Sequence, residues 1–313
     1  MRSFYRGVIS FAIFIVIIYG VILFCFNFYL EKEIEKTNTI RSTTRVLAMG
    51  DSHLECGVND ITDDVFENRS RMSERYYQVY LKLKYILENS ENKDKLKAIC
   101  LTYNTFSLKK SQDSLYCGVS PNHHFVRNYS PMFRDYYNRP QLYHLPIDSK
   151  SYCYSYVSSY MVGITDIRDW ILHGKVRNLF EFHGSFINED KKHIKSFTKK
   201  EKDSNWDSDV ELSNIQKDHL KLIATLARTN NIQLVLVNAP CHKYYNLSVN
   251  PKLVAANTEF ANQLNRDYGV IYLDFHNAFL HNKCFRDYEH LSVDGANIFT
   301  PMLRDTLISL GLY

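Results

Sequence analysis

The stretch that decides the fold is Val46-Leu47-Ala48-Met49-Gly50-Asp51-Ser52-His53. Four apolar residues run without interruption up to a glycine, and a short apolar run that ends at a turn residue is typical of a buried strand. The sequence predicts this strand at 45–50 and four further strands along the chain, at 64–68, 97–103, 232–238 and 270–275.

Helical patterns separate most of these strands. Apolar residues recur at helical spacing in four segments, 73–88, 208–231, 251–269 and 291–312. Solid apolar strands that alternate with amphipathic helices indicate a parallel sheet with helices on both faces. The predicted fold is therefore a three-layer α/β/α domain around a five-stranded parallel sheet, as in flavodoxin. In such sheets the functional site lies at the carboxyl ends of the strands.

The N-terminal region predicts a membrane anchor. Residues 8–30 are almost wholly apolar and carry no charge, and a run of this length spans a bilayer core of ~30 Å as a helix. Arginines precede the run, so the positive-inside rule places the N-terminus in the cytoplasm and the rest outside. A cleaved signal peptide is the rival interpretation, but the bulky residues at 23–28 disfavour a cleavage site. We expect a cytoplasmic segment at 1–7, a transmembrane signal anchor at 8–30, a stalk at 31–44 and the main domain at 45–313.

Composition narrows the function classes. The chain has 313 residues, a net charge of +4 and no long basic tract, so nucleic-acid binding is not indicated.

The region at about 105–207 is rich in Tyr, Ser, His and Asn and lacks periodicity, so we expect an inserted cap over the strand ends. Cys100 lies in an apolar strand and is expected to be a buried free thiol, whereas Cys117 and Cys153 could pair within the insertion. No spacing of His and Cys predicts a metal site, and no cofactor is expected.

Two short motifs supply the parts of serine-based acyl chemistry. Ser52 follows a strand end, where a turn exposes its hydroxyl and leaves backbone N–H groups to bind an oxyanion. A serine becomes a nucleophile only when a base takes its proton. His290 is the candidate base, and Asp287, three positions earlier, can orient its ring. Each motif also has an ordinary interpretation, since Ser52 could be a turn serine and Asp287 a helix N-cap.

Other polar residues follow the predicted strand ends. Asn104 follows the strand at 97–103, and His242 follows the strand at 232–238. We expect both to lie near Ser52, because the carboxyl ends of parallel strands share one edge of the sheet. His242 and His53 are candidate substrate-binding residues.

The order of these motifs resembles the SGNH (GDSL-like) hydrolase superfamily. The residues that carry the resemblance are Gly50-Asp51-Ser52 after the first strand and Phe285-Arg286-Asp287-Tyr288-Glu289-His290-Leu291-Ser292 before the last helix. An N-terminal anchor followed by an outward-facing domain is similar to the arrangement in the membrane-anchored branch of this superfamily. That branch includes DltD of teichoic-acid D-alanylation and the AlgJ/AlgX-like acetyltransferases. The resemblance covers about 45–104 and 232–313 and does not cover the insertion.

The resemblance implies a role for each matching residue. Ser52 would be the nucleophile, His290 the base and Asp287 its orienting partner. An oxyanion hole would be formed by the Ser52 backbone, Asn104 and Ser70. The chain departs from the family pattern in two places, because it lacks the usual Gly-x-Asn-Asp block around Asn104 and has no glycine at 68–70.

The resemblance also implies a function. We expect a membrane-anchored, extracytoplasmic serine esterase or O-acyltransferase that acts on envelope polysaccharide or glycolipid through an acyl-serine intermediate. It would sit in the inner membrane with its domain outside and could work with an integral-membrane acyltransferase. The alternative is a catalytically inactive scaffold of the same fold that binds such an acyltransferase or a glycan.

Overall fold

The structure, a computed structural model, describes residues 1–115, 164–174, 184–187, 210–279 and 282–313. Its centre is a five-stranded parallel sheet in the order β2-β1-β3-β4-β5. The strands are β1 (Val46–Met49), β2 (Phe66–Asn68), β3 (Ala98–Thr102), β4 (Gln233–Asn238) and β5 (Ile271–Asp274). This order is that of flavodoxin-like sheets, so the predicted fold class and all five predicted strands are confirmed.

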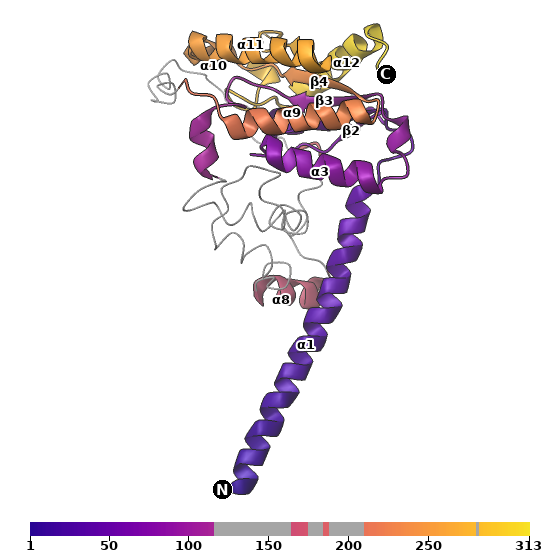
Figure 1. Cartoon of the computed structure of the whole chain (residues 1–313), viewed down its shortest axis with the longest axis vertical. Coiled ribbons are helices and arrows are strands. Elements are labelled where there is room, and N and C mark those ends of the chain that lie inside the picture. The colour runs from indigo at the N-terminus through magenta and orange to yellow at the C-terminus, as the bar shows by residue number, and fades with distance from the viewer. Residues whose placement is uncertain (116–163, 175–183, 188–209, 280–281) are drawn as a thin grey trace.

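The helices form the layers on both faces of the sheet (Figure 1). The larger ones are α3 (Tyr76–Asn89), α9 (Asn214–Thr229), α11 (Pro251–Tyr268) and α12 (Val293–Ser309). Shorter helices are α2 (Ser52–Gly57), α8 (Ile164–His173) and α10 (Lys243–Ser248), and three-ten turns lie at Lys93–Lys95, Lys110–Leu115 and Asn282–Cys284. The four helices predicted in the main domain are thus α3, α9, α11 and α12.

Alternate side chains of β1 enter two separate hydrophobic cores, because successive residues of a strand point to opposite faces. Leu47 and Met49 pack with residues of α3, α9 and α11. Val46 and Ala48 pack with residues of α2 and α12. All four side chains are fully buried, so β1 lies in the middle layer and carries Gly50 and Ser52 to the edge of the sheet.

Caps visible in the sequence set the helix ends. Ser213 caps α9, and its side chain accepts from the backbone of Gln216. Asn250 caps α11, proline occupies the first turn, and Gly269 ends the helix in a left-handed conformation. These are the expected chemistries of helix starts and stops.

The N-terminus is one long helix, α1 (Arg2–Asn38). Its segment Phe4–Phe26 is long and apolar enough to cross a membrane, by length and composition. The predicted stalk is helical as far as Asn38, since its Glu and Lys residues favour helix. Trp170 of α8 packs against Phe26 and Tyr29, with ring centroids 5.3 and 5.9 Å apart, so α8 lies beside α1 (Figure 1).

The predicted cap falls largely outside the described residues, as do Cys117 and Cys153. Cys100 is fully buried and free, as predicted. One described piece of the insertion, 184–187, reaches the main domain. There Ile187 donates to the carbonyl of Glu55, Phe186 is buried, and Gly184 lies against the backbone of Arg69 and Ser70.

Candidate active site

The turn after β1 presents Ser52 at the carboxyl edge of the sheet. Gly50 has φ 123°, a conformation that favours glycine, and a Cβ there would lie 2.6 Å from Oγ1 of Thr102. Asp51 caps α2 by accepting from the backbone N–H of His53 at 3.0 Å. Ser52 is therefore the first residue of α2, fixed by a tight turn behind it and a cap beside it.

A second loop brings His290 to the same edge. Phe285 and Leu291 pair as an antiparallel bridge that closes the loop. Within it, Oδ1 of Asp287 accepts from the backbone N–H groups of Glu289 and His290, both at 2.8 Å. Backbone groups of its own loop thus fix the Asp287 side chain, in addition to its contact with the His290 ring.

Ser52, His290 and Asp287 form a continuous hydrogen-bonded chain. Nε2 of His290 lies 2.7 Å from Oγ of Ser52, and its Nδ1 lies 2.9 and 2.8 Å from the two carboxylate oxygens of Asp287. Burial alone would raise the pKa of Asp287, but the hydrogen bond and charge of His290 outweigh it and lower the pKa. An ionised carboxylate at Nδ1 holds the proton there and leaves Nε2 able to accept the Ser52 proton.

A second acid–histidine pair lies beside this chain. Nδ1 of His53 lies 3.0 Å from Oδ1 of Asp51, and the His53 ring centroid is 5.2 Å from that of His290. Burial opposes ionisation of both groups, but their mutual attraction outweighs it. The pKa of Asp51 is lowered and the pKa of His53 is raised well above 6.5. The pair is therefore ionised.

Neither predicted substrate-binding histidine is exposed. His53 and His242 are 6% and 1% accessible. His53 is held by Asp51, as described above. His242 caps α10 through its ring nitrogen, and its backbone N–H donates to the carbonyl of Tyr288 at 3.0 Å. Direct contact of either side chain with a substrate stays a prediction. In the structure both histidines contact other residues of the same domain and help to hold its loops.

The predicted oxyanion-hole donors have intramolecular partners. The amide of Asn104 donates to Oδ2 of Asp51 at 2.9 Å. The backbone N–H of Ser70 donates to Oδ1 of Asn68 at 2.9 Å. Ser52 stands at the first position of α2, where a backbone N–H has no partner within the helix. The amide nitrogen of Asn104 also lies 3.1 Å from Nδ1 of His53, so Asn104 lies beside the second acid–histidine pair.

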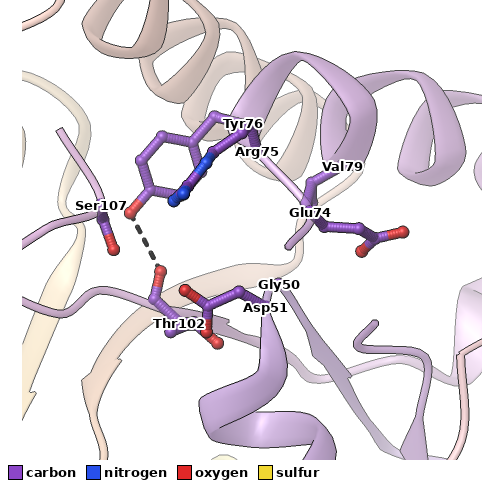
Figure 2. A pocket seen from close by; sticks show the side chains of 8 residues that line it. All are labelled: Gly50, Asp51, Glu74, Arg75, Tyr76, Val79, Thr102 and Ser107. Carbon is purple, nitrogen blue, oxygen red and sulfur yellow. Dashed lines mark hydrogen bonds between the residues drawn. The ribbon is translucent and has the colours of Figure 1, made fainter. Parts of the chain in front are cut away.

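A small cavity lies between the Gly50–Asp51 turn and the start of α3 (Figure 2). Tyr76 donates across it to the carbonyl of Thr102 at 2.9 Å. The cavity measures about 10 Å³, the space that one water needs. Its lining includes Arg75, whose charge helps to lower the pKa of Asp51.

Sequence reasoning missed a cluster of buried ionisable residues at α2. Glu55, one turn after Ser52, is 9% accessible, and burial together with the charge of Glu74 raises its pKa to about 7. Glu74 forms an ion pair with Lys82, and both side chains are almost fully buried. The signal in the sequence was weak, because acidic residues are common in the first turn of a helix.

Comparisons with known proteins add an overall likeness. No protein-family model matches the chain, and no curated protein matches it either. One solved structure that matches is a candidate acylhydrolase from Bacteroides fragilis, with 10% identity, a TM-score of 0.40, and coverage of 86% of this chain and 88% of that one. Another is a GDSL-like lipase from Bacteroides thetaiotaomicron, with 9% identity, a TM-score of 0.39, and coverage of 87% and 91%. The interpretation of the site rests on its own geometry.

Proposed function

We propose that this chain is a serine esterase or O-acyltransferase of the SGNH (GDSL-like) type. The observation that carries the proposal is the hydrogen-bonded chain Ser52–His290–Asp287, whose Ser52–His290 distance of 2.7 Å suits proton transfer from a nucleophile to its base. The position of the chain at the carboxyl edge of a flavodoxin-like sheet also supports it, because functional sites of such folds lie there.

In the first half-reaction, Oγ of Ser52 attacks the carbonyl carbon of an ester while Nε2 of His290 accepts the hydroxyl proton. The carbonyl oxygen carries the negative charge of the tetrahedral intermediate, and Asp287 stabilises the imidazolium. The intermediate collapses, the bond to the leaving alcohol breaks, and His290 returns its proton to that alcohol. The product is acyl-Ser52.

In the second half-reaction, His290 takes a proton from water or from a sugar hydroxyl, which attacks the acyl carbon. Collapse of the second intermediate returns the proton to Ser52. Water gives hydrolysis, and a sugar hydroxyl gives acyl transfer. No metal or redox group is needed for the proton and electron balance of either half-reaction.

The oxyanion requires hydrogen-bond donors near Ser52. The backbone N–H of Ser52 is the first candidate. Asn104 is the second, because its amide carries two hydrogens and the contact with Asp51 accounts for one. Nδ1 of His53 lies 3.0 Å from Oδ1 of Asp51, so it donates to that carboxylate and does not accept the other hydrogen. Ser70 would have to release Asn68 before its N–H could contribute.

The proposed setting is a membrane surface. The apolar segment Phe4–Phe26 of α1 would cross the inner membrane, with the N-terminus in the cytoplasm and the domain outside. Tethering favours a polymeric or membrane-linked substrate, so the proposed substrate is envelope polysaccharide or glycolipid. An integral-membrane acyltransferase is the proposed partner, in line with the resemblance to the DltD and AlgJ/AlgX-like branch.

A non-catalytic scaffold is the second candidate function. Two hydrogen bonds favour it, because they occupy the predicted oxyanion donors: the Asn104 amide donates to Asp51, and the Ser70 N–H donates to Asn68. A non-catalytic protein does not need free donors to bind an oxyanion. The Ser52–His290 contact argues against it. A scaffold would bind a glycan or a membrane acyltransferase without forming an acyl-enzyme.

A fluorophosphonate probe separates the two candidates. The full chain in detergent micelles is treated with the probe, and the adduct is measured by intact mass. Labelling that is lost in Ser52→Ala and kept in Ser309→Ala, an exposed serine on α12, supports the enzyme. A folded wild-type chain that takes up no probe refutes the proposed enzyme and supports the scaffold.

A further inference from the structure

A second pocket opens at the same edge of the sheet, over the carboxyl ends of β3, β4 and β5. Its volume is about 50 Å³, and α11 forms one wall. The polar residues that line it include Asn104, Asn238, Asn257, Asp274 and His276. None of these residues except Asn104 belongs to the proposed active site.

The pocket contains a hydrogen-bond acceptor without a partner. Asn257 is 4% accessible. Its amide nitrogen donates to the carbonyl of Thr105 at 2.6 Å, but its Oδ1 has no partner among the described residues. A buried carbonyl of this kind costs free energy unless a donor reaches it. A ligand or water that brings an O–H group would supply that donor.

The other polar groups form a connected set. Asn238 donates to Oδ1 of Asp274 at 3.0 Å, and the same oxygen lies 2.6 Å from Nδ1 of His276. Amide, carboxylate and imidazole groups combine acceptors with donors at short spacing. The ring of Tyr272 adds an apolar wall beside them. This combination suits a ligand with several hydroxyl groups and one apolar face.

The charges of the lining residues restrict the class of ligand further. Among the described residues that line the pocket there is no Lys or Arg, and Asp274 contributes a carboxylate. A phosphate or a carboxylate ligand would therefore meet a like charge with no Lys or Arg in the lining to offset it. The chemistry favours a neutral polyol.

Size and position connect the pocket to Ser52. A single water needs about 10–15 Å³ by the same measure, so 50 Å³ holds a few waters or one edge of a sugar ring. Neighbouring strands lie ~4.8 Å apart, and β4 is the second strand from β1, so the pocket lies about 10 Å from the β1 end. Asn104 lines the pocket and also contacts Asp51.

We propose that this pocket is a binding subsite for a neutral sugar unit of the substrate, next to the unit whose ester faces Ser52. The proposal rests on the proposed function for its link to the reaction, and not for binding itself. The hydroxyl groups of the sugar unit would donate to Asn257 and Asp274, and its C–H face would lie on the ring of Tyr272. The subsite would align a polysaccharide along the carboxyl edge from β5 toward β1.

The test blocks the pocket from its rim. Val254 of α11 lines the pocket and is 42% exposed, so Val254→Trp adds a large ring at the mouth without overfilling the core. Thr258→Trp does the same one turn further along α11. Glu259→Trp is the matched control, because Glu259 is exposed on the same helix, pairs with Arg266 and does not line the pocket.

Binding is measured by saturation-transfer NMR on the full chain in micelles of a sugar-free detergent. The probes are neutral tetrasaccharides of glucose, mannose, xylose and N-acetylglucosamine, with tetragalacturonate as the charged counterpart. The expected result is saturation of at least one neutral probe, reduced about tenfold or more in both tryptophan variants and unchanged in Glu259→Trp. Signals that survive both blocking variants, absence of signal with all neutral probes, or preference for tetragalacturonate would overturn the subsite.

Fluorophosphonate labelling of the same samples keeps the two proposals apart. Both blocking variants are expected to label at Ser52 like the wild type, since the probe is small and does not need the subsite. Sugar binding without labelling would support the subsite and refute the esterase. Labelling without Val254-dependent binding would refute the subsite and leave the esterase standing.

Discussion

Replacement of Glu55 by glutamine should stabilise the protein at high pH and leave it unchanged at low pH. Glu55 lies in α2, one turn after Ser52, and its Oε2 is buried without a partner among the described residues. Burial is the main cause of its raised pKa, and the charge of Glu74 adds to it. Glutamine keeps the shape of the side chain and removes the charge.

The magnitude follows from the difference between the two pKa values. The ordinary pKa is 4.5, and in the folded chain it is about 7, which leaves a difference of 2.5. Each pKa unit corresponds to about 1.4 kcal/mol. Between these two values the folded state binds more protons than the unfolded state, so stability falls as pH rises and the full cost is present above pH 7. Glu55→Gln should therefore gain up to about 3 kcal/mol near pH 8 and almost nothing near pH 4.5.

The assay is thermal unfolding of the full chain in detergent micelles at both pH values. A gain of 1 kcal/mol corresponds to a rise in Tm of about 2–4 °C in domains of this order of size. Glu88→Gln is the control, because Glu88 is an exposed glutamate in α3 with an i,i+4 partner. Equal shifts at both pH values, or an equal shift in the control, would refute the argument that Glu55 is buried and protonated near neutral pH.

Three further outcomes are expected. Asp287→Asn should slow p-nitrophenyl acetate hydrolysis by about 10³–10⁴-fold with little change in Tm, because the wrong tautomer of the histidine is then favoured; a loss below tenfold would remove Asp287 from the mechanism. Gly50→Ala should destabilise by about 2 kcal/mol or more, whereas Gly269→Ala, also at positive φ but with open space around it, should cost only about 1 kcal/mol in thermal unfolding. With Trp206 replaced by Phe, the fluorescence of Trp170 should be quenched more by lipids brominated near the headgroup than by lipids brominated deep in the chain, because Trp170 packs at the end of the apolar span; no quenching by either lipid would place α8 away from the membrane.

The central strands β1, β3 and β4 could be predicted because their burial is nearly complete. β1 is apolar at every position, β3 is apolar up to Thr102, and both strands are buried along their whole length, which is the pattern of a parallel sheet between two helical layers. Turn residues such as Gly50 and Pro240 follow the apolar runs, so the ends of these strands were visible in the sequence. The bounds of α1 were less predictable, because charged residues that disfavour a membrane span can still continue a helix.

The candidate site could be predicted only where local sequence fixes it. Gly50-Asp51-Ser52 and Asp287-x-x-His290 each build their own turn, so their residue types already suggest the chemistry. The burial of Glu55 and the engagement of Asn104 by Asp51 depend on which side chains other elements bring near. Nothing in the adjacent residues records these tertiary contacts.

The loop after β4, in which sequence reasoning placed a substrate-binding histidine, lies next to both halves of the candidate site. In the sheet order this loop lies between the ends of β3 and β5. On one side the thiol of Cys241 contributes to the raised pKa of His53, next to Ser52. On the other side Cys241 Sγ lies 3.6 Å from the carbonyl of Glu289, and the N–H of His242 donates to Tyr288.

The same loop therefore contacts both the turn that carries Ser52 and the loop that carries His290. Its own position is fixed by the backbone bond from Cys241 to the carbonyl of His276 at 3.0 Å, just after β5. A buried histidine that caps a helix and supports a neighbouring loop has the same sequence signature as one that binds substrate, because both follow a strand end. The distance of 2.7 Å between Ser52 and His290 thus joins two segments that the loop after β4 also contacts. The two motifs predicted the residue types of the candidate site, but the residues packed around them come from other elements and could not be read from the motifs.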